Sequence, residues 1–185
     1  MMFLYFAYGS NMLPARLADR CPSARVRGLG LARHYNVEFS KPSRDGSGKA
    51  TIVRCEGAAV PGVIFEIDAR ERDALDLHEG AGTGYDRVDD FSVELIPNVE
   101  QICVTTYIAT ARNAELNPFD WYLAAVIAGA MHHHLNAKHL KQLSTSGHVI
   151  DLNVSRPTRL RALRAMRADG IEDYRLLLQP AGPVS

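Results

Sequence analysis

"FAYGSN", residues 6–11, ends an apolar segment and begins a polar one. Aromatic residues are frequent just before the break, which predicts a buried strand over residues 3–8. A helix-like segment, 11–21, follows, with Asn11 as its expected N-cap. A strand that ends in this way presents backbone N–H groups near the positive end of a helix dipole, and Gly9 lets a ligand approach the backbone closely. The turn therefore suits a carboxylate or another small anion.

The remaining elements follow in an order that predicts the fold class. Strands dominate the first part of the chain and helices the last, and they do not alternate strictly, which argues against a doubly wound parallel sheet. We predict an α+β fold, in which a small mixed or antiparallel sheet closes into a barrel with flanking helices, because closure removes exposed strand edges. The expected elements are strands over 32–40, 50–55 and 59–67, an acidic helix over 68–80, a hairpin of 85–96 with 101–110, a long apolar helix within 117–135 and a basic helix over 157–168.

The composition is that of a soluble protein without a dominant charge. The 185 residues include 21 Lys and Arg against 21 Asp and Glu. No apolar run approaches the roughly 20 residues that span a membrane, and the length suits one domain over 1–185. Balanced charge argues against nucleic acid or an anionic membrane as a partner. A reducing, cytoplasmic setting is expected because the cysteines are odd in number and widely spaced; they are Cys21, Cys55 and Cys103.

Three motif-like stretches fail the tests for cofactor, metal or covalent chemistry. DGSGKA, residues 45–50, lacks the first Gly and the final Ser or Thr of a phosphate-binding loop, so we interpret it as a mobile surface loop. The adjacent histidines of MHHHL, residues 131–135, point about 100° apart on a helix and do not converge on one ion. Ser10 follows Gly9, but Asn11 stands where a nucleophile elbow has its second Gly. We expect no metal and no cofactor.

The basic helix offers an interpretation as an interaction surface. Five arginines lie between Arg156 and Arg167, a patch that suits RNA or a protein partner. Leu160, Leu163 and Met166 recur at helical spacing, which favours an amphipathic helix with one solvated basic face.

LDLHEG, residues 75–80, contains a candidate catalytic carboxylate. Glu79 lies four residues after Leu75, so the two share a helix face, and a core-facing Leu75 brings Glu79 toward the interior. Glu79 also lies in the last turn before Gly80, where the helix dipole and burial both favour a neutral carboxyl group. These conditions suit a general acid or base. The alternative is an ordinary exposed Glu at a helix end.

The pair FAYGSN and LDxxEG, followed by Tyr85, resembles the gamma-glutamylcyclotransferase family. GKATIV and VPGVIFEI resemble the paired strands of that family. The likeness covers residues 3–140, and 141–185 form a less clearly matched helical extension. NPFDWYLAAVIAGA resembles a later helix of the family, and its matching residues are Pro118, Tyr122, Gly129 and Ala130.

The resemblance implies a small mixed-sheet barrel and an enzyme that acts on a small gamma-glutamyl molecule. The enzyme would cyclise the gamma-glutamyl group to 5-oxoproline and release an amine or amino acid, which is lyase or acyltransferase chemistry at a C–N bond. Glu79 would be the general acid/base, and neither a metal nor an organic cofactor is implied. Asn11 separates the chain from the glutathione-specific branch, which typically has Leu at this position. The implied substrate-binding residues are Tyr8, Gly9, Ser10, Asn11, Tyr85 and Tyr122.

Two other classes of function stay open at this point. One is a non-catalytic module that binds a small carboxylate, which the presence of Glu79 disfavours. The other is an interaction protein that uses the basic helix, which the balanced charge and the lack of an RNA-binding motif disfavour. The sequence also leaves open the oligomeric state and the leaving amine, because dipeptides, gamma-glutamylamines and carrier-bound groups share the reacting half.

Overall fold

The computed structural model describes residues 1–178, so the last residues of the expected extension lie outside the described range. Its strands are β1 (Met2–Ala7), β2 (Arg25–Pro42), β3 (Gly48–Asp68), β4 (Tyr85–Ile96) and β5 (Glu100–Ala109). Its α-helices are α1 (Pro14–Ala18), α2 (Arg72–Glu79), α3 (Asp120–His132), α4 (Ala137–Ser144) and α5 (Pro157–Ala168). Its 3-10 helices are η1 (Ser10–Met12), η2 (Ala69–Glu71) and η3 (Tyr174–Leu178).

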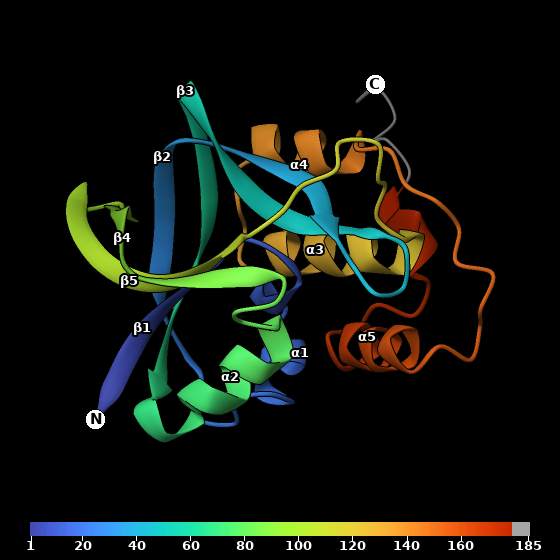
Figure 1. Cartoon of the computed structure of the whole chain (residues 1–185), viewed down its shortest axis with the longest axis horizontal. Helices are drawn as coiled ribbons and strands as arrows, with labels where there is room; N and C mark the ends of the chain where they lie inside the picture. The colour runs from blue at the N-terminus through green and yellow to red at the C-terminus, as the bar shows by residue number, and fades with distance from the viewer. Residues whose placement is uncertain (179–185) are drawn as a thin grey trace.

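The strands form a closed barrel in the order β1-β3-β2-β4-β5. Neighbouring strands are antiparallel except for β1 and β5, whose parallel contact at Tyr5 and Thr105 closes the barrel. Figure 1 shows the barrel on one side of the molecule, α3, α4 and α5 on the other, and α1 and α2 near its lower end. The expected α+β class, with a mixed barrel and flanking helices, is confirmed.

Helix α3 forms the centre of the helical layer. Every residue from Asp120 to Ala130 is buried, as expected for a helix that is apolar nearly all round. It packs against η1 on one side and against α4, α5 and η3 on the other. The buried Asp120 accepts hydrogen bonds from the Tyr174 hydroxyl at 2.8 Å and from the Asp151 amide at 3.2 Å. Among residues 1–178, no helix combines the length and the apolar character needed to cross a membrane.

The acidic helix α2 ends where the sequence predicts. Leu75 is fully buried, and Glu79, four residues later, is partly buried at the last helical position. Gly80 adopts the left-handed conformation with φ 69° and ψ 44°, which favours glycine and terminates the helix. The end of α2 therefore fixes the Glu79 backbone beside the barrel.

Two expectations about local structure are wrong. The segments 50–55 and 59–67 belong to one strand, β3, because β2 pairs with both halves across an irregularity in register. Asn11 is not an N-cap: it lies within η1, and α1 begins only after Leu13. The Asn11 side chain is thereby free for long-range contacts.

Helix α5 has the predicted bounds but a different buried face. Arg159 is buried, whereas Leu160 is 44% exposed. The Arg159 guanidinium donates to the Asp151 carbonyl oxygen at 2.6 Å. This tertiary contact, and not the apolar periodicity of the helix, determines that Arg159 faces the interior. The sequence analysis also did not predict α4, which lies in the polar segment before α5.

Candidate active site

A cavity of about 210 Å³ lies among β1, η1, α2 and α3. The turn between β2 and β3 contributes a further wall. The cavity brings together all the residues that the sequence nominated, which are Tyr8, Gly9, Ser10, Asn11, Glu79, Tyr85 and Tyr122.

The Glu79 carboxylate is oriented through one of its two oxygens. Asn11 Nδ2 and an Arg20 guanidinium nitrogen each donate to Glu79 Oε1 at 2.7 Å. The Glu79 and Arg20 side chains are only 15% and 17% exposed, so the ion pair is well shielded from water. Arg20 thus lies beside the carboxylate at the end of α2, a contact that the sequence alone did not predict. Within residues 1–178, Oε2 has no hydrogen-bond partner.

Asn11 connects Glu79 to the floor of the cavity. Its Nδ2 also donates to the Tyr5 hydroxyl at 2.9 Å. Its Oδ1 is buried and has no hydrogen-bond partner among the described residues. A buried acceptor of this kind is costly when left unsatisfied, so the site presents an acceptor for a ligand N–H group.

Backbone amides and a cation surround the loop after β1. The amides that begin η1 have no partner within that turn, as at any helix start. The Ser10 hydroxyl accepts a hydrogen bond from Arg16 Nε at 3.0 Å. Burial, and then the like charge of Arg20, lower the pKa of Arg16 to about 10, so its guanidinium stays charged near pH 7. The loop therefore favours an anionic group.

Three tyrosines that line the cavity form hydrogen bonds with backbone groups. Tyr85 donates to the Ala50 carbonyl oxygen at 2.7 Å, and the Tyr122 hydroxyl accepts from the Ala50 amide at 3.1 Å. Tyr8 donates to the Tyr107 carbonyl oxygen. Burial raises the pKa of all three phenols, so they stay neutral near pH 7. Tyr8, Tyr85 and Tyr122 thus define the shape of the cavity and add no charge to it.

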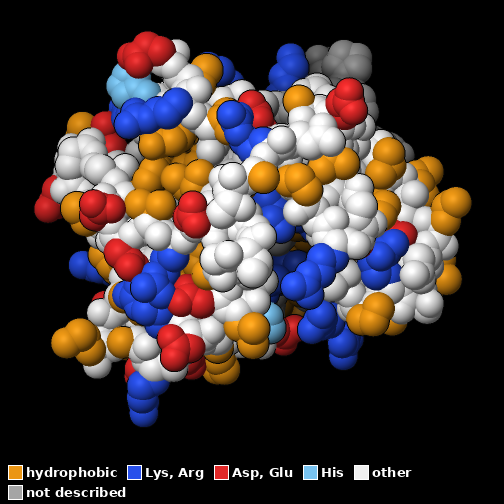
Figure 2. Space-filling model, viewed as in Figure 1, with side chains coloured by type: hydrophobic (Ala, Val, Ile, Leu, Met, Phe, Trp, Pro, Cys, Tyr) orange, Lys and Arg blue, Asp and Glu red, His pale blue; other side chains and the backbone are white. Residues whose placement is uncertain are grey.

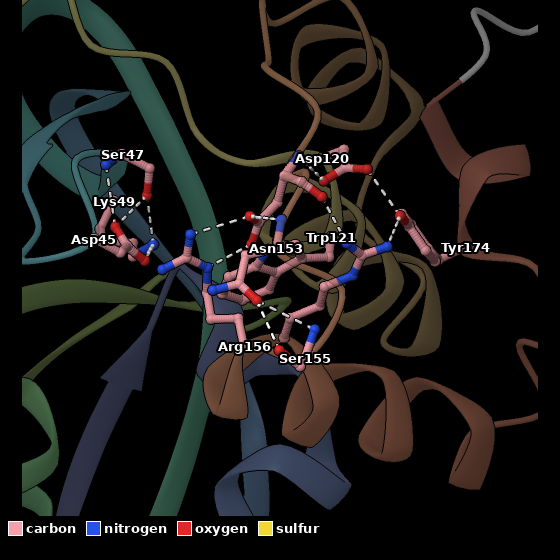
Figure 3. A network of polar contacts seen from close by, with 11 residues as sticks. Asp45, Ser47, Lys49, Asp120, Trp121, Asn153, Ser155, Arg156 and Tyr174 are labelled. Atoms are coloured by element: carbon pink, nitrogen blue, oxygen red, sulfur yellow. Dashed lines mark hydrogen bonds and ion pairs between the residues drawn. The ribbon is translucent and has the colours of Figure 1, made fainter.

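Lys49 lies in the cavity wall and not in an exposed loop. Its Nζ is 3.0 Å from Asp45 Oδ2 and 2.7 Å from Ser47 Oγ. The ammonium also lies over the rings of Tyr122 and Trp121, 4.7 and 5.1 Å from their centroids. Figure 3 shows this cluster at the turn between β2 and β3, beside the residues that hold Trp121. The surface interpretation of residues 45–50 is therefore wrong for Lys49, whose side chain is 15% exposed.

The start of α5 supports the same wall. Trp121 Nε1 donates to Asp151 Oδ2 at 2.9 Å, and the Arg156 guanidinium donates to Asp151 Oδ1 at 3.1 Å (Figure 3). Arg156 also lies over the Phe119 ring, 4.9 Å from its centroid. Arg156, the first arginine of the basic patch, thus makes contacts within the protein and is not a free surface charge.

Known proteins match the chain over most of its length. Residues 59–143 match the model of the AIG2-like family. The gamma-glutamylcyclotransferase of Bos taurus is 28% identical over 148 residues, which cover 77% of this chain and 78% of that protein. The Homo sapiens protein of the same name is 28% identical over 146 residues, which cover 76% and 77% respectively. The chain is thus similar to gamma-glutamylcyclotransferases over about three quarters of its length.

The comparison with solved structures supports the fold. A structure described as gamma-glutamyl cyclotransferase has a TM-score of 0.80 at 24% identity, and the match covers 89% of this chain and 99% of that one. The closed barrel with flanking helices is thus the gamma-glutamylcyclotransferase-like fold. The AIG2-like match includes Glu79, Tyr85 and Tyr122, whereas the Tyr8–Asn11 loop precedes it.

Sequence analysis missed two arginines of this candidate site. Arg16 and Arg20 both line the cavity, one on α1 and the other just after it. They lie four residues apart, directly after the loop, and that spacing places them on one face of the expected 11–21 helix. This spacing is the feature of the sequence from which the two site arginines could have been predicted.

The histidines of residues 132–134 contact different partners. His132 Nδ1 lies 2.5 Å from Asp169 Oδ1, and His133 Nε2 lies 2.9 Å from the Met12 carbonyl oxygen. Over residues 1–178, no group of three or more His, Cys, Asp or Glu side chains is placed to hold a metal ion. The cysteines are free thiols, and only Cys21 is buried.

Proposed function

We propose that the chain is a cyclotransferase that converts a gamma-glutamyl group to 5-oxoproline and releases an amine or amino acid, with Glu79 as general acid/base. One observation carries the proposal: both protein partners of the Glu79 carboxylate bind Oε1, at 2.7 Å each. Oε2 is therefore available to exchange a proton with a molecule in the cavity. A base that is fixed through one oxygen and reactive through the other suits repeated proton transfer.

The charged groups of the cavity suit the gamma-glutamyl half of such a substrate. The α-carboxylate is the anion expected against Arg16 and the amides at the start of η1. The α-ammonium group is expected near Glu79 and Asn11 Oδ1, the acceptor that has no protein partner. This arrangement supports the proposal, because the amine then lies beside the base that must deprotonate it.

The reaction requires proton transfers between the substrate and Glu79 and no covalent enzyme intermediate. Glu79 Oε2 takes a proton from the α-ammonium group, whose ordinary pKa is about 7.7–8.0. The free amine attacks the side-chain carbonyl carbon of the same molecule, forming the C–N bond of a five-membered ring and a tetrahedral oxyanion. The protonated Glu79 then gives its proton to the leaving nitrogen and the original C–N bond breaks, while the positively charged ring nitrogen gives its extra proton back to Glu79. Glu79 passes this second proton to the released amine, so the products are 5-oxoproline and the amine in its ammonium form. Because the nucleophile is tethered to its target, proximity replaces a catalytic Ser or Cys.

Release of 5-oxoproline is the direct test of this function. We expect the purified chain to release 5-oxoproline from gamma-glutamyl-alanine, with a higher kcat/KM than for glutathione. The substrate ranking rests on Asn11, whose amide binds Glu79 at 2.7 Å and which takes the place of the Leu typical of the glutathione-specific branch. Both substrates are measured side by side on one preparation. Binding without any 5-oxoproline would support the carboxylate-binding module instead, and a preference for glutathione would contradict the ranking.

Substitution of Gly9 tests the loop. A Cβ atom at Gly9 would lie 3.2 Å from Ala50 Cβ and 3.6 Å from the Tyr122 hydroxyl oxygen. The branched side chain of Gly9→Val would therefore crowd the cavity wall, and overpacking typically costs about 1–3 kcal/mol. We expect KM for gamma-glutamyl-alanine to rise by about tenfold or more, since about 1.4 kcal/mol corresponds to tenfold. The measurement is steady-state kinetics of a variant with parental circular dichroism, and an unchanged KM would remove the loop from the binding site.

A further inference from the structure

A second cavity, of about 300 Å³, adjoins the proposed active site. Four of its lining residues, Arg16, Arg20, His78 and Thr158, also line the first cavity, so the two spaces share a wall. Arg161 lies on the far side of this shared wall, on α5, because it lines the second cavity and not the first. Arg20, the ion-pair partner of Glu79, lines both cavities, so the second cavity adjoins the part of the first where the proposed reaction protonates the leaving nitrogen.

Positive charge dominates the second cavity. Three arginines line it against one carboxylate, that of Asp19. Arg20 is paired with Glu79, but Arg16 and Arg161 form no ion pair with any of residues 1–178. Burial, and then the nearby Arg20, lower the pKa of His78, so that His78 is neutral near pH 7 and adds no positive charge. Figure 2 shows Lys and Arg side chains gathered around a hollow in the region of α1 and α5.

We propose that the second cavity holds the leaving half of the substrate and selects leaving groups that carry a negatively charged side group, with Arg161 as the specificity-determining residue. This inference rests on the proposed function, because the position of the leaving half follows from the role of Glu79. The matching substrate class is a gamma-glutamyl amino acid with an acidic side chain. A guanidinium without a protein partner binds a carboxylate by charge-assisted hydrogen bonds, and the polar surroundings offer no comparable partner for an apolar leaving group.

The position of Arg161 separates this subsite from the catalytic groups. Arg20 orients Glu79, and Arg16 bonds Ser10, so substitution of either would disturb the chemistry itself. Arg161 is exposed on α5 and touches none of these groups by an ion pair or a hydrogen bond within residues 1–178. Arg164, on the same helix, is equally exposed and lines neither cavity, which makes it a matched control.

The experiment compares two substrates that differ in charge and hardly in shape, gamma-glutamyl-glutamate and gamma-glutamyl-glutamine. For the parent chain we expect the ratio of kcat/KM for the acidic over the neutral substrate to be about tenfold, the lower end of the range for one hydrogen bond to a charged group. Arg161→Gln is expected to bring this ratio close to one, and Arg164→Gln to leave it as in the parent.

The outcomes separate the inference from the function on which it rests. Equal use of both substrates by the parent, or an equal loss of the ratio in Arg161→Gln and Arg164→Gln, would overturn the subsite and leave the cyclotransferase function intact. No 5-oxoproline from these substrates or from gamma-glutamyl-alanine would overturn the proposed function, and the subsite with it. A ratio lost only in Arg161→Gln supports the proposal.

Discussion

Glu79→Gln is expected to lower kcat for 5-oxoproline release by at least about a hundredfold, because general acid–base catalysis contributes typically about 10²–10⁴-fold. A glutamine side chain can still fill the position of the carboxylate, and its amide oxygen can still accept the hydrogen bonds from Asn11 and Arg20. It takes no proton from the substrate ammonium group and returns none to the leaving nitrogen. Since one residue serves both transfers, the loss falls on kcat, whereas the affinity for substrate is expected to persist.

The control for this variant is another partly buried glutamate. Glu71, at the start of α2, accepts hydrogen bonds from the Ser23 amide at 3.2 Å and from the Ser23 hydroxyl at 2.6 Å, and it does not line the cavity. Glu71→Gln makes the same chemical change outside the site, so kcat is expected to stay near the parental value. Calorimetric titration with gamma-glutamyl-alanine reports binding for both variants. Near-normal turnover by a folded Glu79→Gln protein would contradict the mechanism, and loss of binding alone would make Glu79 a substrate anchor.

Gly129→Ala is expected to lower the free energy of unfolding, against the usual trend for helices. In an open helix position the change from Gly to Ala is favourable by about 1 kcal/mol. At Gly129, a Cβ atom would lie 2.6 Å from the Leu13 amide nitrogen and 2.7 Å from Met12 Cβ. The Leu13 contact is to backbone, which cannot rotate away, so α3 and the segment after η1 must separate. Overpacking of this kind costs about 1–3 kcal/mol, sometimes more, and we expect it to outweigh the gain in helix propensity.

Thermal unfolding and kinetics together test the Gly129 prediction. A net loss of about 1 kcal/mol corresponds to a fall of roughly 2–4 °C in Tm for a chain of this size. Because Met12 and Leu13 directly follow Ser10 and Asn11, a shift of this segment is also expected to raise KM for gamma-glutamyl-alanine. A Tm above that of the parent would show that helix propensity prevails and that the close packing of α3 on this segment tolerates a methyl group.

The sequence by itself determined the elements that depend on local interactions. The bounds of α5, the hairpin of β4 with β5, and the end of α2 at Gly80 follow from periodicity, turn residues and the left-handed conformation that glycine favours. The spacing of Leu75 and Glu79 placed both on one helix face for the same reason. The motifs that resemble those of a known family predicted seven site residues, and all seven line one cavity.

Only the tertiary structure decided the partners of those residues. The two groups that bind Glu79 Oε1 lie 68 and 59 residues away along the chain, at Asn11 and Arg20, so no local pattern encodes their approach. Local patterns also do not predict that Arg159 is buried against Asp151, because the apolar residues of α5 predicted a different buried face. Local geometry sets which face of an element a side chain occupies, whereas the charge environment of a carboxylate depends on every group that packing brings within a few ångströms. For this reason the sequence indicated a catalytic Glu79, but only the fold showed that Oε1 is bound by Asn11 and Arg20 whereas Oε2 has no hydrogen-bond partner among residues 1–178.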